Sequence, residues 1–270
     1  MTQPPPRLSV IIPAYNEEAR IRASLERLRD YFAGPTASAG GAEIVVVDDG
    51  STDGTAAIVE AFAAGGGRGA VAFRLLRNGV NRGKGYSIKH GVLLSAGSFV
   101  LLSDTDFSTP IEELPRLLRL VESEGYGIAF GSRGLPDSRV ETHQPAWRET
   151  MGRCFNLLVR ALTGLPYRDT QCGFKVMRRE AVLPLFRAAR VERFAYDVEI
   201  LYLARLAGVR AIEVPVIWRN ALGSKVNALF DSSDMLKDIV KVVVRGRRGR
   251  YGALGGPATE AAPRGGRAGS

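Results

Sequence analysis

Two aspartates that could bind a cation, Asp104 and Asp106, follow the short apolar run at 99–102. Carboxylates this close repel each other unless a cation joins them, and hard oxygen ligands suit Mg²⁺ or Mn²⁺. A cation held there would bridge the oxygens of a diphosphate and neutralise the charge on a departing nucleotide. The pair therefore predicts a metal site, although an Asp-x-Asp pattern gains weight only from its position and its neighbours.

Polar loops also follow two earlier apolar runs. The run at 8–12 ends in the loop 13–17, and the run at 43–47 ends in the loop 48–51. In doubly wound sheets, ligands bind beyond the carboxyl ends of the strands, so we expect these loops and the aspartate pair to form one site. The alternative is that Asp-Gly-Ser in the second loop is only a turn and a helix cap.

A glycine-rich segment at 81–85 precedes a predicted helix. Its glycines would let the backbone approach a phosphate, and Lys84 adds positive charge near the helix N-terminus. The segment is not a Walker loop, because three residues rather than four separate Gly79 from Gly83 and Gly85 stands where Ser or Thr should bind magnesium. A simple loop entering a helix is the alternative.

The elements that must position these residues alternate between strands and helices. Periodicity predicts strands at 8–12, 43–47, 71–75, 99–102 and 128–130, and helices near 18–32, 53–64, 84–96 and 112–124. This alternation indicates a mostly parallel sheet that is covered on both faces. The later part predicts helices at 146–163 and 197–206, a strand at 174–177, and an extended segment at 211–218 interrupted by Pro215.

The composition is that of an ordinary folded domain. The 270 residues are 45% hydrophobic and 24% charged, enough for one large domain or two small ones. Two cysteines and two histidines exclude a disulfide scaffold and a four-thiolate zinc site, and they favour a reduced, cytoplasmic setting. No stretch approaches the roughly 20 apolar residues of a membrane span. The net charge of +9 favours anionic partners: a membrane surface, phosphorylated substrates or nucleic acid.

The motifs at the strand ends form a recognisable series. In chain order they read PAYNE from Pro13, DDGS from Asp48, NRGKG from Asn81, DTD from Asp104 and GSR from Gly131. This series resembles family 2 glycosyltransferases of the GT-A fold, over roughly residues 7–252. Three later segments are more specific and resemble dolichyl-phosphate β-glucosyltransferases: DTQCGFK from Asp169, FAYDVE from Phe194, and Trp218 with GSK from Gly223.

The resemblance implies a catalytic domain over 7–222 with the GT-A fold, a Rossmann-like, mostly parallel central sheet with helices on both faces. It implies an inverting glycosyltransferase that moves a sugar onto a polyprenyl or dolichyl phosphate, with Mg²⁺ or Mn²⁺ at the catalytic Asp104 and Asp106. The segment DTQCGFK favours glucose over mannose, and therefore UDP-glucose as donor. The resemblance assigns donor binding to Pro13, Tyr15, Glu17, Asp48, Asp49, Ser51 and Lys84.

On the acceptor side, the third catalytic candidate is Asp169, which would face the sugar or the acceptor phosphate. A lipid phosphate is already anionic at pH 7 and needs no general base, so we interpret Asp169 as a positioning group. The resemblance also places Gln171, Asp197 and Glu199 near the site; for the two acids the alternative is an exposed position on an amphipathic helix. Basic residues that could draw in the acceptor phosphate, unless each is only a solvated surface charge, are Arg133, Arg139, Arg148 and Lys225.

The C-terminal part predicts a basic amphipathic, membrane-proximal segment at 223–252 and a disordered tail at 253–270. An apolar helix face followed by Arg245, Arg247, Arg248 and Arg250 suits the membrane interface. We therefore expect a peripheral protein at the cytoplasmic face of the membrane. A helix packed on the catalytic domain with a solvated basic end is the alternative. No base-reading motif accompanies the basic cluster, so no nucleic-acid partner is expected.

Two other functions remain open at this point. One is a family 2 transferase with a soluble glycan or small-molecule acceptor. The other is a non-catalytic protein that binds nucleotide sugars, which the intact Asp-x-Asp pair argues against.

Overall fold

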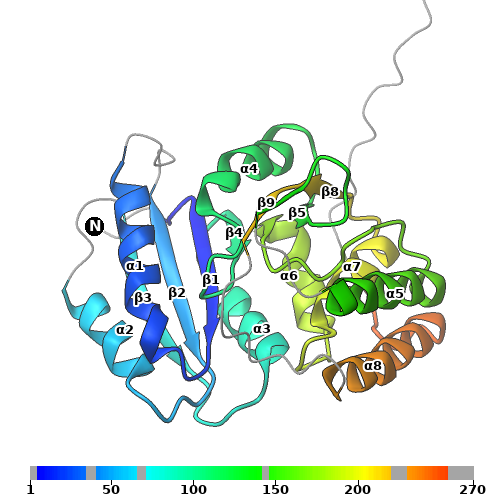
Figure 1. Ribbon diagram of the computed structural model, residues 1–270, viewed down its shortest axis with the longest axis horizontal. Coiled ribbons are helices and arrows are strands. Elements are labelled where there is room, and N and C mark those ends of the chain that lie inside the picture. The colour runs from blue at the N-terminus through cyan, green and yellow to red at the C-terminus, as the bar shows by residue number, and fades with distance from the viewer. Residues whose placement is uncertain (1–4, 35–40, 66–70, 142–145, 220–229, 255–270) are drawn as a thin grey trace, which may run out of the picture.

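The computed structural model describes residues 5–34, 41–65, 71–141, 146–219 and 230–254. A seven-stranded sheet forms its centre, with helices on both faces (Figure 1). The strand order is β3-β2-β1-β4-β7-β5-β8. All neighbouring strands run parallel except β7, which is antiparallel to both β4 and β5. The strands are β1 (Leu8–Ala14), β2 (Ala42–Asp48), β3 (Val71–Arg77), β4 (Phe99–Leu102), β5 (Ile128–Ser132), β7 (Lys175–Arg178) and β8 (Ala211–Pro215). The prediction of a mostly parallel sheet is confirmed.

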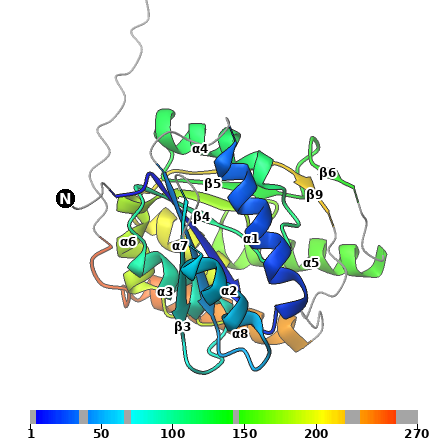
Figure 2. The same cartoon turned by 90° about the vertical axis from the view of Figure 1, so that its left-hand side faces the viewer.

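The helices fall into two layers (Figures 1 and 2). One face of the sheet is covered by α1 (Glu18–Ala33), α2 (Thr55–Ala64) and α4 (Leu114–Ser123), which the 3₁₀ turn η1 (Ile111–Glu113) precedes. On the other face lie α3 (Lys84–Leu94), α6 (Arg179–Ala188), α7 (Tyr196–Leu206), α5 (Ala146–Thr163) and α8 (Phe230–Arg247). A short second sheet pairs β6 (Arg139–Val140) with β9 (Ile217–Trp218).

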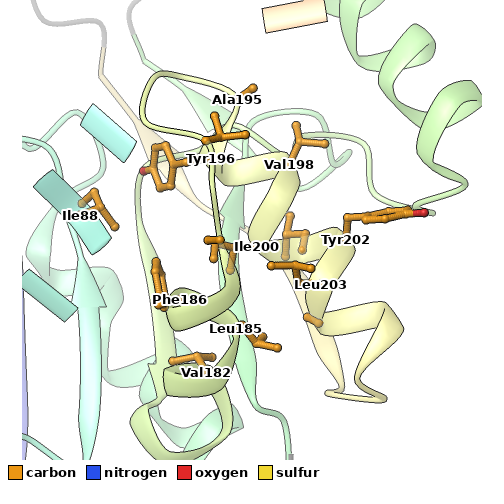
Figure 3. Close-up of a cluster of buried hydrophobic side chains, with 14 of the residues drawn as sticks. Ile88, Val182, Leu185, Phe186, Ala195, Tyr196, Val198, Ile200, Tyr202 and Leu203 are labelled. Atoms are coloured by element: carbon orange, nitrogen blue, oxygen red, sulfur yellow. The ribbon is translucent and has the colours of Figure 1, made fainter. Parts of the chain in front are cut away.

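Alternation along the strands creates the two cores. Ile11 and Val45 point into the cluster beneath α3, α6 and α7, whereas Val10 and Val46 point into the cluster beneath α1 and α4. Successive strand residues face opposite sides of a sheet, so continuous apolar runs are needed to bury both faces. Figure 3 shows the first cluster, where side chains of α6 and α7 pack opposite Ile88 of α3.

The strand order reverses direction at β1, which lies between β2 and β4. The loops after β1 and β4 therefore leave the sheet side by side at its carboxyl edge. Such a topological switch point is where open α/β sheets bind ligands, which places the aspartate pair beside the loop after β1.

The sequence missed three features on the C-terminal side. Helix α6 contains Pro184, and a proline inside a helical pattern reads as a break because it lacks an N–H donor. Burial of Val182, Leu185 and Phe186 on one face stabilises the helix nonetheless. The short strand β6 and the antiparallel direction of β7 are pairing properties that a single segment does not encode.

Candidate active site

A cleft of about 410 Å³ opens at the switch point between β1 and β4. Of the residues predicted from sequence, it brings together Pro13, Tyr15, Glu17, Asp49, Lys84, Asp104 and Asp106. It also gathers residues to which the sequence assigned no role of their own: Arg20, Asn81, Ser87, Arg193 and Phe194. The last two come from the segment between α6 and α7, where Phe194 begins the FAYDVE motif. The prediction that the three polar loops converge is confirmed.

The aspartate pair is held by the residue between its members. The Thr105 hydroxyl donates to the Pro13 carbonyl at 3.1 Å, and the Thr105 carbonyl accepts from the Ser24 hydroxyl at 2.5 Å. Thr105 is thereby buried against β1 and α1, and it lines the cleft together with Asp104 and Asp106. The turn closes with Phe107 at a φ of +48°, a left-handed conformation that a bulky residue adopts only under constraint.

The Lys84 ammonium forms an ion pair with Asp104, and both residues line the cleft. Burial alone would raise the pKa of Asp104, but the Lys84 charge lowers it below the ordinary value. Burial would likewise lower the pKa of Lys84, yet the carboxylates of Asp104 and Asp197 raise it. Both groups therefore stay charged at neutral pH. Gly173 leaves room for this carboxylate, since a Cβ atom there would collide with an Asp104 oxygen.

Asp49 organises the glycine loop from the end of β2. Its carboxylate accepts hydrogen bonds from the Arg82 N–H at 3.0 Å, the Gly83 N–H at 2.7 Å and the Asn78 amide at 2.7 Å. Gly83 has a φ of +106°, which favours glycine over residues with a side chain. The loop therefore delivers Lys84 and the N-terminus of α3 to the cleft, as the sequence predicted; contact with a phosphate stays a prediction.

Asp48 and Ser51 lie behind the cleft wall. Asp48 accepts a hydrogen bond from the Ser51 N–H at 3.2 Å, and the Ser51 hydroxyl accepts one from the Asn16 N–H at 2.9 Å. These bonds tie the loop after β2 to the loop after β1. The structure thus gives both residues a supporting place, and direct substrate contact remains a prediction for them.

Asp169 is fully engaged with Arg133. Its oxygens accept the Arg133 Nε–H at 2.7 Å, the Arg133 Nη2–H at 2.9 Å and the Arg133 backbone N–H at 3.0 Å, and the Gln171 N–H adds a bond of 3.2 Å. Burial would raise the pKa of Asp169, but the Arg133 guanidinium lowers it. A carboxylate with so many donors makes a poor base, which supports its interpretation as a positioning group.

Asp197 and Glu199 are buried, so the alternative that they are exposed acids of an amphipathic helix is wrong. Asp197 pairs with the buried Lys175 at 2.5 Å, and the Lys175 ammonium also donates to the Cys172 carbonyl at 2.5 Å. This buried pair lies next to Lys84, whose pKa it influences. Sequence reasoning missed Lys175, although it closes the DTQCGFK motif.

Gln171 and Arg139 are not brought into the cleft. The Gln171 side chain reaches the Met235 sulfur on α8 at 3.7 Å. Arg139 is exposed on β6. The side chain of Arg148 and all of Lys225 lie outside the described residues.

Comparison with known proteins decides the family. Residues 9–186, well over half of the chain, match the profile described as Glycosyl transferase family 2. The chain belongs to glycosyl transferase family 2. A dolichyl-phosphate beta-glucosyltransferase of Dictyostelium discoideum is 36% identical over 244 residues, which cover 88% of this chain and 74% of the relative. The protein of the same name from Homo sapiens is 32% identical over 249 residues, covering 90% and 76%.

Solved structures of other glycosyltransferases confirm the GT-A fold expected for this family 2 member. Glucosyl-3-phosphoglycerate synthase from Mycobacterium tuberculosis, in complex with Mn²⁺ and UDP-glucose, superimposes with a TM-score of 0.62 at 18% identity, covering 90% of this chain and 79% of that one. Its complex with UDP gives a TM-score of 0.63 at 20% identity, with coverage of 88% and 80%. At such identity the likeness concerns the fold alone.

Proposed function

We propose that this family 2 glycosyltransferase moves glucose from UDP-glucose onto a polyprenyl phosphate such as dolichyl phosphate, with inversion at the anomeric carbon. The observation that carries the proposal is the single cleft at the switch point, where Asp104, Asp106 and Lys84 meet the loops after β1 and β2. Relatives named dolichyl-phosphate beta-glucosyltransferases, 32–36% identical over most of the chain, support the choice of donor sugar and acceptor.

Asp104 and Asp106 would hold a Mg²⁺ or Mn²⁺ ion, and their carboxylate oxygens are the ligands that such hard cations prefer. Within the described part of the chain, no group of three or more His, Cys, Asp and Glu side chains is placed to hold a metal. Oxygens of the donor diphosphate and water would supply further ligands. When bound, the ion supplies positive charge that stabilises the departing diphosphate, and Lys84 adds charge at the same place.

The transfer needs alignment rather than proton removal. An oxygen of the acceptor phosphate forms a bond to the anomeric carbon while the bond from that carbon to UDP breaks, and the electron pair leaves with UDP. The attacking phosphate is already ionised at pH 7. Arg133, fixed by Asp169 and close enough to lower the pKa of Asp104, would balance the acceptor charge. A single displacement yields the β-linked sugar phosphate.

Purified protein supplied with Mg²⁺ or Mn²⁺, UDP-glucose labelled in the sugar, and polyprenyl phosphate is expected to form a labelled glycolipid. GDP-mannose in place of UDP-glucose is expected to label much less, since the segment around Gln171 favours glucose. Labelling of a soluble glycan, with none of the polyprenyl phosphate, would instead support the soluble-acceptor alternative. UDP-glucose binding without transfer to either acceptor, and unchanged in Asp104→Ala, would support a non-catalytic binding protein.

We propose that helices α5 and α8 bring the enzyme to the membrane surface, at the cytoplasmic face, where free thiols such as Cys154 and Cys172 are stable. No helix within the described residues is long and apolar enough to cross a membrane. Helix α8 packs into the core through Met235, Ile239 and Val242, so this helix shares the core of the catalytic domain. Large apolar side chains nevertheless remain exposed on both helices: Trp147, Leu157, Leu158, Val240 and Val244.

Replacing Leu157, which is 65% exposed, with serine is expected to weaken binding to phosphatidylserine vesicles by about tenfold, because an apolar side chain then no longer enters the interface. Leu94→Ser on α3 is the matched control, since Leu94 is 48% exposed on another helix and should bind as the wild type does. Co-sedimentation with vesicles measures both. Equal binding of the two variants would contradict the proposal.

A further inference from the structure

The segment between α6 and α7, residues 189–195, forms one wall of the donor cleft without belonging to a helix or strand. Arg193 and Phe194 line the cleft. The Glu192 carbonyl accepts the Tyr86 N–H at 2.9 Å, and the Glu192 carboxylate pairs with Arg82 at 2.5 Å. The wall and the glycine loop therefore hold each other in place.

Two glycines of the NRGKG motif show how closely this wall approaches. A Cβ atom on Gly83 would lie 2.6 Å from the Glu192 carbonyl oxygen, and one on Gly85 would lie 2.7 Å from the carbonyl oxygens of Val191 and Arg193. Real Cβ atoms essentially never come so near to backbone oxygens. Displacing the wall would consequently change the shape of the loop that carries Lys84.

Glu199 of α7 fastens the wall from behind. It is fully buried, and its Oε2 atom accepts the N–H groups of Arg190 at 2.9 Å and of Val191 at 2.8 Å. These two residues lie near the start of the irregular segment, where their N–H groups have no helix or strand partner. One carboxylate thus satisfies both backbone donors. On the outer side, the Lys89 ammonium donates to the Ala189 carbonyl at 2.7 Å.

The other oxygen of Glu199 is taken by a residue from the C-terminal end of the described chain. The Tyr251 hydroxyl donates to Glu199 Oε1 at 2.7 Å, and both groups are buried. Tyr251 stands four residues beyond the end of α8 at Arg247. Burial and the Glu199 carboxylate raise the pKa of Tyr251, so the phenol keeps its proton and stays a donor throughout the physiological range.

We propose that the Tyr251–Glu199 hydrogen bond is a latch that fixes the wall of the donor cleft, so that the chain beyond α8 sets the affinity for the nucleotide. Glu199 and Tyr251 are then positioning residues: neither lines the cleft, and both act through the backbone of 190–194. The inference rests on the proposed function, because it takes the cleft to be the nucleotide site. The latch gives Glu199 a role, which neither the proposed metal site nor the acceptor side does.

Tyr251→Phe is the first test, since it removes one hydroxyl and keeps the ring. We expect the amides of Arg190 and Val191 to exchange hydrogen about tenfold faster, the factor that corresponds to losing a hydrogen bond to a charged group. The dissociation constant of UDP should rise by a similar factor, whereas kcat at saturating donor should stay close to that of the wild type. Hydrogen exchange by mass spectrometry and calorimetric titration with UDP give the two readouts.

The control and the rescue use neighbouring positions. Tyr202→Phe is the control, because it removes the hydroxyl of a different tyrosine. Tyr202 lies on α7 and packs against α8 near Gly246, and its replacement should leave both readouts unchanged. Glu199→Ala should exceed the effect of Tyr251→Phe. Glu199→Gln should keep most of the wild-type hydrogen-exchange protection and UDP affinity, because its amide oxygen still accepts both backbone N–H groups.

Wild-type exchange at Arg190 and Val191 in Tyr251→Phe would overturn the latch. Faster exchange there with unchanged UDP affinity would overturn its coupling to the cleft. A wild-type protein that binds no UDP would refute the proposed function, and with it the effect on nucleotide affinity. The exchange measurements would still decide whether the latch holds the segment.

Discussion

Replacing Asp106 with alanine is expected to lower the rate of glucosyl transfer by about a thousandfold, because half of the carboxylate pair that would hold the divalent cation is lost. Charge stabilisation by a bound cation contributes several kcal/mol to the transition state, and about 4 kcal/mol corresponds to a thousandfold change in rate. The fold should survive, since the Asp106 carboxylate accepts hydrogen bonds from the N–H and the hydroxyl of Ser108, only two residues away. Transfer of labelled glucose to polyprenyl phosphate measures the loss.

A second readout separates the metal from the chemistry. Mn²⁺ binding in the presence of UDP, followed by electron paramagnetic resonance, should weaken in Asp106→Ala. Asp30→Ala is the matched control, because Asp30 is an exposed aspartate on α1 far from the pair in sequence. If Asp106→Ala or a chelator left transfer at the wild-type rate, the assignment of the metal site would be wrong.

Asp169→Asn is expected to destabilise the protein by about 3 kcal/mol and to reduce transfer strongly. Removing one partner of a buried ion pair typically costs 3–5 kcal/mol, because the other charge stays behind unpaired. We expect the lower end of that range because the Arg133 side chain is 34% exposed, so water can partly solvate the charge that is left unpaired. Urea unfolding gives the stability difference, and the transfer assay gives the rate.

The double variant Asp169→Asn with Arg133→Met distinguishes stability from function. With both charges gone, the unfolding free energy should recover in part, while transfer stays low because the acceptor phosphate loses its counter-charge. Recovery of transfer together with stability would mean that the pair is only structural. Unfolding of Asp169→Asn at the wild-type urea concentration would instead contradict the predicted loss of stability, since the pair would then contribute nothing to it.

The contribution of Asp169 to stability has a defined pH range. Arg133 holds the pKa of this carboxyl below its ordinary value, which is near 4 in unfolded chains. A carboxyl whose pKa is lowered on folding stabilises the folded state fully at any pH above its ordinary pKa. This stabilisation is lost as the pH falls through the lower pKa of the folded state. The stability gap between the wild type and Asp169→Asn should thus be constant from neutral pH to about pH 5 and shrink below about pH 4.

The N-terminal half could be predicted from sequence because its signals are local. The runs that became β1, β2 and β4 each end in polar residues, and the parallel order brings Asp104 and Asp106 to the same edge as Asp49. The proposed metal site rests on two residues and one strand. Its position at a helix start predicted that Lys84 adds charge near the helix N-terminus, and the structure adds its ion pair with Asp104.

The C-terminal half could not be predicted to the same depth because its contacts join distant segments. Asp169 and Arg133 are both in recognisable motifs, yet nothing in either motif says that they pair across 36 residues. The resemblance placed the acids of α7 near the site, but their alternation with apolar residues left an exposed position as the alternative. Their burial depends on Lys175 for Asp197 and on Tyr251 for Glu199.

The direction of β7 has a consequence for how this enzyme is assembled. Lys175 at the start of β7 lies opposite Leu102 at the end of β4, so the chain that leads into β7 arrives where β4 departs. A strand of the same length running the other way would deliver that chain to the opposite rim of the sheet, about 13 Å away. Because β7 runs antiparallel, the loop that precedes it lies at the same edge of the sheet as the loop after β4. Gly173 therefore reaches Asp104 without another crossover helix.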